Sequence, residues 1–560
     1  MKPKGTTVPR RKIPNKLPKL WYGCNATDDA FALDPREAQV IRNMHIDENA
    51  VAATRHGCRL LNTTALDGAV TAIYDFRRPD GASFTNEWII KAGQYLYSMN
   101  PSTFVVTEIV NMDTENRPTF ATFQDADSTS YVFIADGINF YKYDGTTLTD
   151  VSTTYPWAYG APRYLFVYDD RLLAAGLDSD PYRVFVSDAL DGTEWFSGEG
   201  STAVYWTLKS PSGDRITGLS QVYNFGVIFQ QFGVAIITEA DPSSDTSQQI
   251  QVSREYGTTS HQSIQSVGNV LYFADRNHIY KGTLRQAIEN GLEVTPIDKN
   301  VYSKYADIVN AGEVVSVYDS SHKEIWWGFR TGKETRNNIA LVYNVGLSGV
   351  AGMYGARDVW SGWFDGDGFE PYAVAPAVRT YTAYRGDGVP YTAEDDVILL
   401  GRQDGHVTMF GEAGQYKDET YTSETVENDI QSEIHTAVMS PHGAAVTKRA
   451  RDIVPLVYSR YNDSTTIQFI VDGRKLSTAR TLAVKNIVPL WNDGTDTDDK
   501  QLWNNTVWTE RPMLVKPIAM NVPFQHLQVI IANDGSNAKD EISYSGLELY
   551  YQPHGIRRNV

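Results

Sequence analysis

The stretch INFYKYDG, residues 138–145, alternates apolar and polar side chains and then ends in an Asp-Gly bend. This combination is typical of a β-strand that leads into a tight turn. Related strand-turn phrases recur at residues 94–100, 183–192, 234–242, 278–282, 340–344 and 406–410. Because propeller blades repeat at about 40–50 residues, the recurrence predicts a β-propeller.

The composition fits a large all-β protein. The 560 residues are 42% hydrophobic and 12% aromatic, with 33 Tyr and 12 Trp, which suits many half-buried strands. A period of about two residues continues to about residue 420, where the acidic segment 417–429 interrupts it. We therefore expect an extended basic arm over residues 1–30, a β-propeller over 31–420 and a C-terminal, β-sandwich-like platform domain over 421–560.

Further elements are predicted outside the repeat. Asp34, Pro35 and Glu37 form a capping pattern that predicts a helix ending near Asn43. Residues 51–54 and 59–61 are expected to pair around a turn at residues 56–57, and a second, short helix is expected at residues 284–290. In the C-terminal domain, strands are predicted at residues 434–439, 453–458, 467–471, 515–519, 527–532 and 543–551.

Charge is unevenly distributed along the chain. The net charge is −18, but residues 1–20 hold seven cations and no acid, so the remaining 43 basic and 68 acidic residues give −25. An acidic body disfavours duplex-DNA binding, which requires dense Lys and Arg. The cations of the arm are candidate partner-docking residues: Lys2, Lys4, Arg10, Arg11, Lys12, Lys16 and Lys19. The alternative for this arm is a solubilising tail.

No pattern in the sequence predicts catalysis. The ten histidines are dispersed, and no nucleophile elbow, phosphate-binding loop or dinucleotide fingerprint is present. The acidic segment 493–499 lacks the EF-hand offsets and is interpreted as a hairpin tip. Cys24 and Cys58 are expected to be free thiols. We therefore predict no enzyme activity, no cofactor and no metal, and no apolar run is long enough for a membrane anchor.

Several phrases resemble a known family. LDPREA at residues 33–38 leads to Arg42-Asn43-Met44 and then to TRHG at 54–57, and this opening resembles that of many phage tail proteins. The segments 187–195 and 256–280 are similar to blade turns and strands in the same group. The family is the tail hub, or nozzle, of short-tailed bacteriophages, also called packaged-DNA stabilisation proteins. The basic arm and the insertion at residues 480–512 depart from it.

The resemblance implies a virion structural protein that is assembled in the host cytoplasm. It would form a ring homo-oligomer, a hexamer, below the portal and the head-to-tail adaptor, and it would contact tail fibre or spike proteins. Such a ring retains packaged DNA and lets it pass during ejection without sequence-specific binding. Two alternatives remain: a propeller glycan hydrolase or lyase, and a receptor-binding propeller without catalysis. An enzyme would show two carboxylates about 5–10 Å apart in an aromatic-lined cleft.

Overall fold

The computed structural model is an all-β protein. It describes residues 12–80, 83–152, 160–195, 204–208, 214–285, 291–348, 357–384, 390–412, 414–458, 463–476, 479–484, 514–515, 517–536 and 542–556. Within these ranges, helix is confined to α1 (Tyr302–Tyr305) and the short 3-10 segments η1 (His261–Ser263), η2 (Lys299–Val301) and η3 (Ala311–Glu313).

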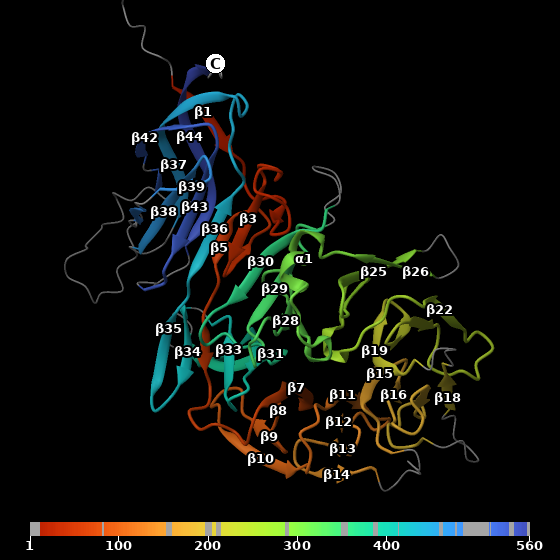
Figure 1. Ribbon diagram of the computed structural model, residues 1–560. Helices are drawn as coiled ribbons and strands as arrows, with labels where there is room; N and C mark the ends of the chain where they lie inside the picture. Colours follow the sequence, from red (N-terminus) through yellow and green to blue (C-terminus); the bar gives the residue numbers. More distant parts are fainter. Residues whose placement is uncertain are drawn as a thin grey trace, which may run out of the picture.

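Seven four-stranded blades form a closed ring, which Figure 1 shows along its axis. Blade 1 consists of β7 (Val70–Asp80), β8 (Ser83–Ala92), β9 (Tyr95–Met99) and β10 (Val106–Asn111). Blade 2 consists of β11 (Thr119–Gln124), β12 (Ser130–Ala135), β13 (Phe140–Tyr143) and β14 (Leu148–Asp150). Blade 3 consists of β15 (Tyr164–Tyr168), β16 (Arg171–Ala175), β17 (Arg183–Val186) and β18 (Val204–Thr207).

The next three blades follow in chain order. Blade 4 consists of β19 (Ile216–Val222), β20 (Phe225–Gln230), β21 (Val234–Ile237) and β22 (Gln249–Ser253). Blade 5 consists of β23 (Gln265–Val267), β24 (Val270–Ala274), β25 (Ile279–Arg285) and β26 (Gly291–Pro296). Blade 6 consists of β27 (Val315–Asp319), β28 (Glu324–Phe329), β29 (Ile339–Asn344) and β30 (Trp360–Asp365). The predicted propeller is confirmed by this strand order.

The seventh blade closes the ring with a strand from the other end of the chain. Its first three strands are β31 (Ala373–Tyr384), β32 (Pro390–Gly401) and β33 (Val407–Phe410), and its outermost strand is β6 (Cys58–Leu60). Met409 of β33 pairs with Arg59 of β6. This pairing leaves the ring without an open seam, so few strand edges are free.

Adjacent blades pack face to face through separate apolar clusters. Six of the interfaces between neighbouring blades have a cluster of their own, as between blades 2 and 3, where Phe133, Phe140 and Leu172 are buried together. The interface between blades 5 and 6 is different. Its residues, which include Tyr272 and Trp327, belong to the large cluster that also fills the second domain.

The second domain consists of two sheets built from both ends of the chain. One sheet holds β4 (Met44–Ile46), β5 (Ala52–Thr54), β44 (Ser543–Ile556), β37 (Val446–Tyr458) and β41 (Leu514–Val515), together with β1 (Ile13–Leu17) and β42 (Ile518–Phe524). The other holds β3 (Glu37–Arg42), β36 (Ser432–Thr436), β43 (Leu527–Asn533), β38 (Asp463–Val471) and β39 (Arg474–Lys475), together with β2 (Gly23–Cys24) and β40 (Arg480–Val484).

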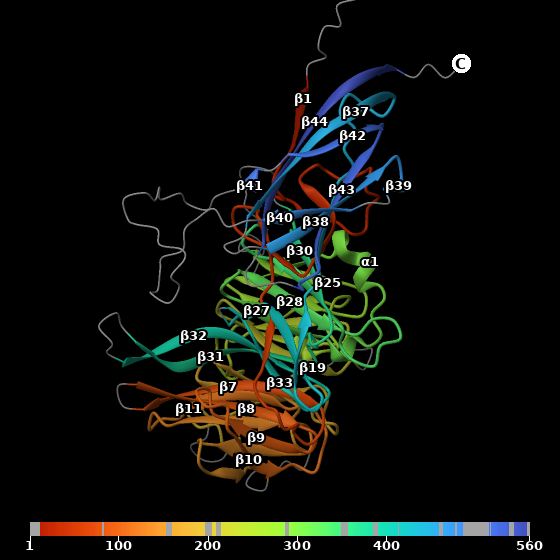
Figure 2. The ribbon, with the colours of Figure 1, turned by 90° about the vertical axis from the view of Figure 1, so that its left-hand side faces the viewer.

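The second domain continues one blade outward. Its second sheet joins β30 of blade 6 through β3, so eleven strands form one sheet from the propeller into the domain. Figures 1 and 2 show this domain extending from the rim of the ring. Ile453 and Leu549 of one sheet and Ile434 and Val529 of the other lie in one buried cluster, which continues to Trp327 of blade 6. The hairpin β34 (Lys417–Tyr421) and β35 (Thr425–Asp429) leads from the propeller into this domain.

The helix predicted after Asp34 is wrong. The capping contacts do form: the Asp34 N–H donates to Glu37 Oε2 at 3.0 Å, and the Arg36 N–H donates to Asp34 Oδ1 at 2.9 Å. They close a turn, and the chain then enters strand β3, which pairs with β2, β30 and β36. Pairing on both sides within a buried sheet therefore overrides a local helix signal.

Two other local expectations are also wrong. β5 and β6 do not pair around the turn at residues 56–57, because β5 joins β4 and β44 in the second domain while β6 joins β33 in the propeller. The short helix expected at residues 284–290 is wrong for its first two residues, because Leu284 and Arg285 lie in β25, opposite Leu292 and Gly291 of β26; residues 286–290 lie outside the described residues. Residues 31–54, expected in the propeller, thus hold strands that pair mainly with the C-terminal part of the chain. Cys24 and Cys58 are free and buried, as predicted.

Candidate functional site

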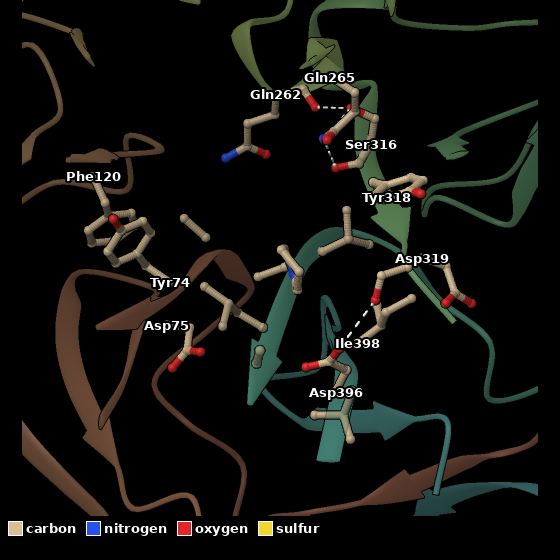
Figure 3. Close-up of a pocket in the computed structure, with 18 of the residues that line it drawn as sticks. Tyr74, Asp75, Phe120, Gln262, Gln265, Ser316, Tyr318, Asp319, Asp396 and Ile398 are labelled. Atoms are coloured by element: carbon tan, nitrogen blue, oxygen red, sulfur yellow. Dashed lines mark hydrogen bonds between the residues drawn. The ribbon is translucent and has the colours of Figure 1, made fainter. Parts of the chain in front are cut away.

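The axis of the propeller holds a cavity of about 990 Å³. It is lined by the first strand of every blade, and Figure 3 shows some of these side chains around the open space. Its size lies at the upper end of the range for small-molecule sites, about 300–1,000 Å³. The residues that matter most for its chemistry are Tyr74, Asp75, Arg77, Phe120, Gln262, Gln265, Tyr318, Asp319, His322 and Asp396.

Two carboxylates of this cavity lie on either side of one strand. Asp75 of β7 accepts a hydrogen bond from the Val378 N–H of β31 at 2.9 Å. Asp396 of β32 is the cross-strand partner of the same Val378. Antiparallel partners have Cα atoms about 4.5–5.5 Å apart, so both carboxylates belong to the same part of the cavity wall. Burial raises the pKa of Asp75 to about 6.

Aromatic and amide side chains complete the wall. The rings of Tyr74 and Phe120 are stacked, with centroids 5.2 Å apart and planes 17° from parallel. The Tyr74 hydroxyl shares a 2.8 Å hydrogen bond with the Thr122 hydroxyl, which holds the ring in place. Gln265 Nε2 donates to the carbonyl oxygen of Ser316 at 3.0 Å and to its hydroxyl at 3.1 Å. These bonds fix the rotamers of the groups that face the cavity.

The cavity is small compared with a stretch of duplex DNA. The major groove of B-DNA alone is about 12 Å wide, and each base pair adds about 3.4 Å of length. A volume of 990 Å³ corresponds to a few base pairs at most. The cavity therefore has the volume of a small-molecule site.

A buried histidine cluster connects the cavity wall to the second domain. His45 of β4 stacks on His322, with ring centroids 3.9 Å apart, and its Nδ1 lies 2.5 Å from Glu324 Oε2. His322 Nδ1 lies 2.7 Å from Asp319 Oδ2. Burial raises the pKa of Glu324 to about 8 and lowers the pKa of His45. We call His45, Asp319, His322 and Glu324 the histidine cluster; sequence spacing gave no sign of it.

The domain joint, defined by Arg42, Asn43, Arg55, Asp365 and Asp418, is held by buried charges. Arg55 pairs with Asp418 through two bonds of 2.6 and 2.9 Å, and the two side chains are 0% and 2% exposed. Arg55 Nε also donates to Asn43 Oδ1 at 3.0 Å. Arg42 Nε donates to Asp365 Oδ1 at 2.6 Å, and Asn43 Nδ2 donates to the same atom at 3.2 Å. The joint therefore ties N-terminal residues to blade 6 and to β34.

The backbone beside the joint requires a glycine. A Cβ atom at Gly57 would lie 2.0 Å from the carbonyl oxygen of Lys417. The Arg-Asn and Arg-x-Gly phrases of the sequence are thus the residues from which this joint is built. Arg42-Asn43 and the segment from Arg55 to Gly57 are separate in the sequence but meet at this joint in the folded protein.

The basic arm is described only in part. Lys2, Lys4, Arg10 and Arg11 lie outside the described residues. Lys12 pairs with Asp452 at 2.5 Å and Lys16 pairs with Glu548 at 2.6 Å, both within the same chain. Between them, β1 is an edge strand that pairs with β44, and Pro14 is tolerated there because one side of an edge strand needs no donor. Lys19 follows β1 and is half-buried.

The axial carboxylates were missed at the sequence level, although one signal existed. Asp75 interrupts the apolar run of residues 73–76, and a charged residue inside a buried strand often marks a site. Asp396 gave no such signal, because it follows Glu394 and Asp395 in an acidic run. Among the described residues, no group of three or more His, Cys, Asp or Glu side chains is arranged to hold a metal ion. The acidic segment 493–499 lies outside the described residues.

Within the described part of the chain, no helix has the length and apolar character needed to cross a membrane. No protein-family model matches the chain, and no curated protein matches it either. Solved structures do match. One is a chain of the crystal structure of the mitotic checkpoint complex, at 12% identity and a TM-score of 0.33, with 62% of this chain and 95% of that chain covered.

Another match is the structure of the Neurospora crassa Pan2 WD40 domain. The identity is 11% and the TM-score is 0.33, with 64% of this chain and 95% of that chain covered. A likeness at this level carries no argument about function. The propeller fold rests instead on the strand order of the seven blades.

Proposed function

We propose that this chain is a virion structural protein, the subunit of a tail nozzle in a short-tailed bacteriophage. Copies of the chain would form a ring, a hexamer, below the portal and the head-to-tail adaptor. The ring would retain packaged DNA, provide the channel for its ejection, and contact tail fibre or spike proteins. Function then rests on shape and contacts, without intrinsic catalysis.

The observation that carries the proposal is the domain joint. The phrases that resemble the nozzle family, Arg42-Asn43 and Arg55 to Gly57, are the residues that fix the second domain to the propeller. Because most of these residues are buried and leave little room for substitution, their resemblance to the nozzle family supports a similar architecture more than a similar surface composition would. A nozzle subunit needs such a joint, because a ring under internal pressure has to transmit force between its parts without hinging.

The small axial cavity restricts where DNA would pass. The cavity on the propeller axis, about 990 Å³, has the volume of a small-molecule site, so we place the channel of the proposed nozzle on the symmetry axis between copies. Large closed assemblies of identical chains are cyclic, and a ring matches the symmetry of a portal. We expect the face toward this channel to be net acidic, because residues 21–560 hold 43 basic and 68 acidic side chains, a balance of −25, and like charge keeps DNA from adhering.

Electron microscopy of the purified chain with its portal and adaptor tests the proposal. We expect a symmetric ring with a central opening wide enough for a duplex, lined mainly by Asp and Glu. One copy of the chain per particle, or a lumen dominated by Lys and Arg, would contradict the proposal. Asp178→Asn, which changes an exposed side chain paired with Arg163, is a matched control that should assemble normally.

A glycan hydrolase is the second candidate, and one observation favours it. Asp75 and Asp396 flank Val378 inside a cavity with stacked aromatic rings. A carboxyl group with a raised pKa beside a second carboxylate is the pair that glycoside hydrolysis uses. Purified protein that cleaves a host polysaccharide, and loses this activity in Asp75→Asn while keeping its melting temperature, would establish the second candidate in place of the first.

A further inference from the structure

The axial cavity presents carboxylate oxygens as hydrogen-bond acceptors, and several donors of its wall are already used. Gln265 uses its amide nitrogen on Ser316, and the Ser320 hydroxyl donates to Asp396 Oδ2 at 3.3 Å. The Ser316 hydroxyl in turn donates to the carbonyl oxygen of Gln262 at 2.8 Å. These donors are satisfied within the wall, while Asp75 and Asp396 carry carboxylate oxygens there and the side-chain amide of Gln262 faces the open space (Figure 3). A ligand that fits this wall brings its own donors.

The charges of the wall favour a positive ligand. Asp75, Asp319 and Asp396 line the cavity, and Arg77 is the basic side chain with a permanent charge among the lining residues. Arg77 pairs with Glu394 at 3.3 Å, on the long hairpin that Figure 2 shows beyond the body of the propeller. Asp319 is held by His322. Three carboxylates against one guanidinium favour a positive ligand, and Asp75 and Asp396 are two of these carboxylates.

The aromatic rings add a second attraction for the same kind of ligand. Tyr74 and Phe120 form a stacked pair at one side of the cavity, and Tyr318 lies across it in Figure 3. Aromatic faces attract ammonium and guanidinium groups, with about 0.5–2 kcal/mol per contact. They also accept the flat face of a guanidinium by stacking.

We infer that the axial cavity binds an organic cation, through a guanidinium or alkylammonium group held between Asp75, Asp396 and the Tyr74–Phe120 pair. The inference does not depend on the proposed nozzle function. A peptide side chain, Arg or Lys, and a free polyamine share the chemistry that the wall recognises.

Isothermal titration of the full-length chain tests this inference with four probes. They are Nα-acetyl-argininamide, its uncharged analogue Nα-acetyl-citrullinamide, spermidine and maltose. We expect one site per chain for at least one cationic probe and at least about tenfold weaker binding of the citrulline analogue, because a charged hydrogen bond is roughly twice as strong as a neutral one. Binding of the argininamide alone indicates a peptide source, and binding of spermidine alone indicates a polyamine.

Matched variants make the result specific to the site. Asp396→Asn and Asp75→Asn should each weaken the cationic probe at least about tenfold, while Asp178→Asn should leave its affinity unchanged. Thermal melting of each variant separates lost binding from lost folding. The inference is overturned if no cationic probe binds at millimolar concentration, if the citrulline analogue binds equally well, or if neither Asp variant weakens binding. Binding of maltose in place of the cations also overturns it and supports the second candidate function.

Discussion

The propeller and the second domain pair their strands in opposite ways. Inside most blades each strand pairs with its neighbour in sequence, as β7 does with β8 and β19 with β20. In the second domain, β1 and β5 pair with β44, at the opposite end of the chain. The propeller is therefore a series of local hairpins, whereas the second domain exists only when both ends meet. The two regions still share one core, since Trp327 of blade 6 and Ile453 of β37 lie in the same cluster.

The largest expected effect comes from breaking that shared core. Trp327 is fully buried, and its Nε1 donates to the carbonyl oxygen of Ser263 at 3.1 Å. Trp327→Ala should lower the free energy of unfolding by about 3–5 kcal/mol, through lost burial and a cavity. Because the cluster spans both regions, fluorescence and hydrogen exchange should report one cooperative loss. A variant in which the propeller alone loses protection would mean that the regions are independent.

Arg55→Leu tests the joint between the regions. Removing the guanidinium leaves Asp418 buried without its partner, which we expect to cost about 3–5 kcal/mol. Chemical denaturation measures the loss, and limited proteolysis should show earlier cleavage near the β34–β35 hairpin. The exposed Arg163–Asp178 pair supplies the control, because Asp178→Ala should change stability by less than about 1 kcal/mol. Equal effects of the two changes would contradict a special role for the joint.

The third prediction concerns pH at the contact of β4 with blade 6. Glu324 has a pKa of about 8 in the folded protein against 4.5 as its ordinary value. The folded state thus holds this proton more tightly, and the stability that it contributes is full below pH 4.5 and is lost as pH rises through 8. Glu324→Gln should remove this pH-dependent loss of stability. The free energy of unfolding of the variant should therefore rise relative to that of the native protein by a few kcal/mol between about pH 5 and about 8.

Urea denaturation of both proteins at several pH values measures that difference. Burial lowers the pKa of His45 from its ordinary value of 6.5, so this residue acts in the other direction. The stability that neutral His45 contributes to the folded protein is lost as pH falls below 6.5. Arg55, His56, Asp319 and His322 also act on His45, and they are common to the native protein and the Glu324 variant. A pH-independent difference between the two proteins would contradict a buried, protonated Glu324.

The smallest effect is expected at the arm. Lys16 is exposed and pairs with Glu548 on the neighbouring strand. Lys16→Ala should leave the melting temperature unchanged at physiological salt, because exposed ion pairs contribute little. An unchanged melting temperature would mean that backbone pairing of β1 with β44, and not the side-chain ion pair, is the main attachment of the arm to the second domain. A clear drop in melting temperature would assign that role to the side chain.

Much of the propeller could be predicted from local pattern, and the failures have one physical origin. Alternation and turn residues identified the strand at residues 140–143 because its partners lie close in sequence. β3 was predicted as a helix, and β6 was predicted as a strand but with the wrong partner, because their partners β36 and β33 lie hundreds of residues away. The capping contacts of Asp34 and Glu37 do form, so the local signal itself was correct. The chain after this turn becomes a strand because of a sheet whose other members lie far away in sequence.

The candidate site was less predictable than the fold. Asp75 and Asp396 come together only because the ring places β7 beside β31. The same holds for His45 and His322, which stack across two domains. Of the predicted docking residues, Lys12 and Lys16 pair within the chain, and this does not test their proposed partner. Spacing along a sequence identifies sites within one element, and here the chemistry arises between elements.

The strand β6 also determines when the protein can be completed. It is made early in synthesis, but its partner β33 begins only at Val407. At about 5–20 residues per second, this interval lasts tens of seconds. During that time the first six blades can form in order from their own hairpins, while β6 has no partner. An incomplete chain therefore exposes the unpaired strand edge of β6. Chaperones or proteases that recognise such an edge could distinguish an incomplete subunit from a complete one.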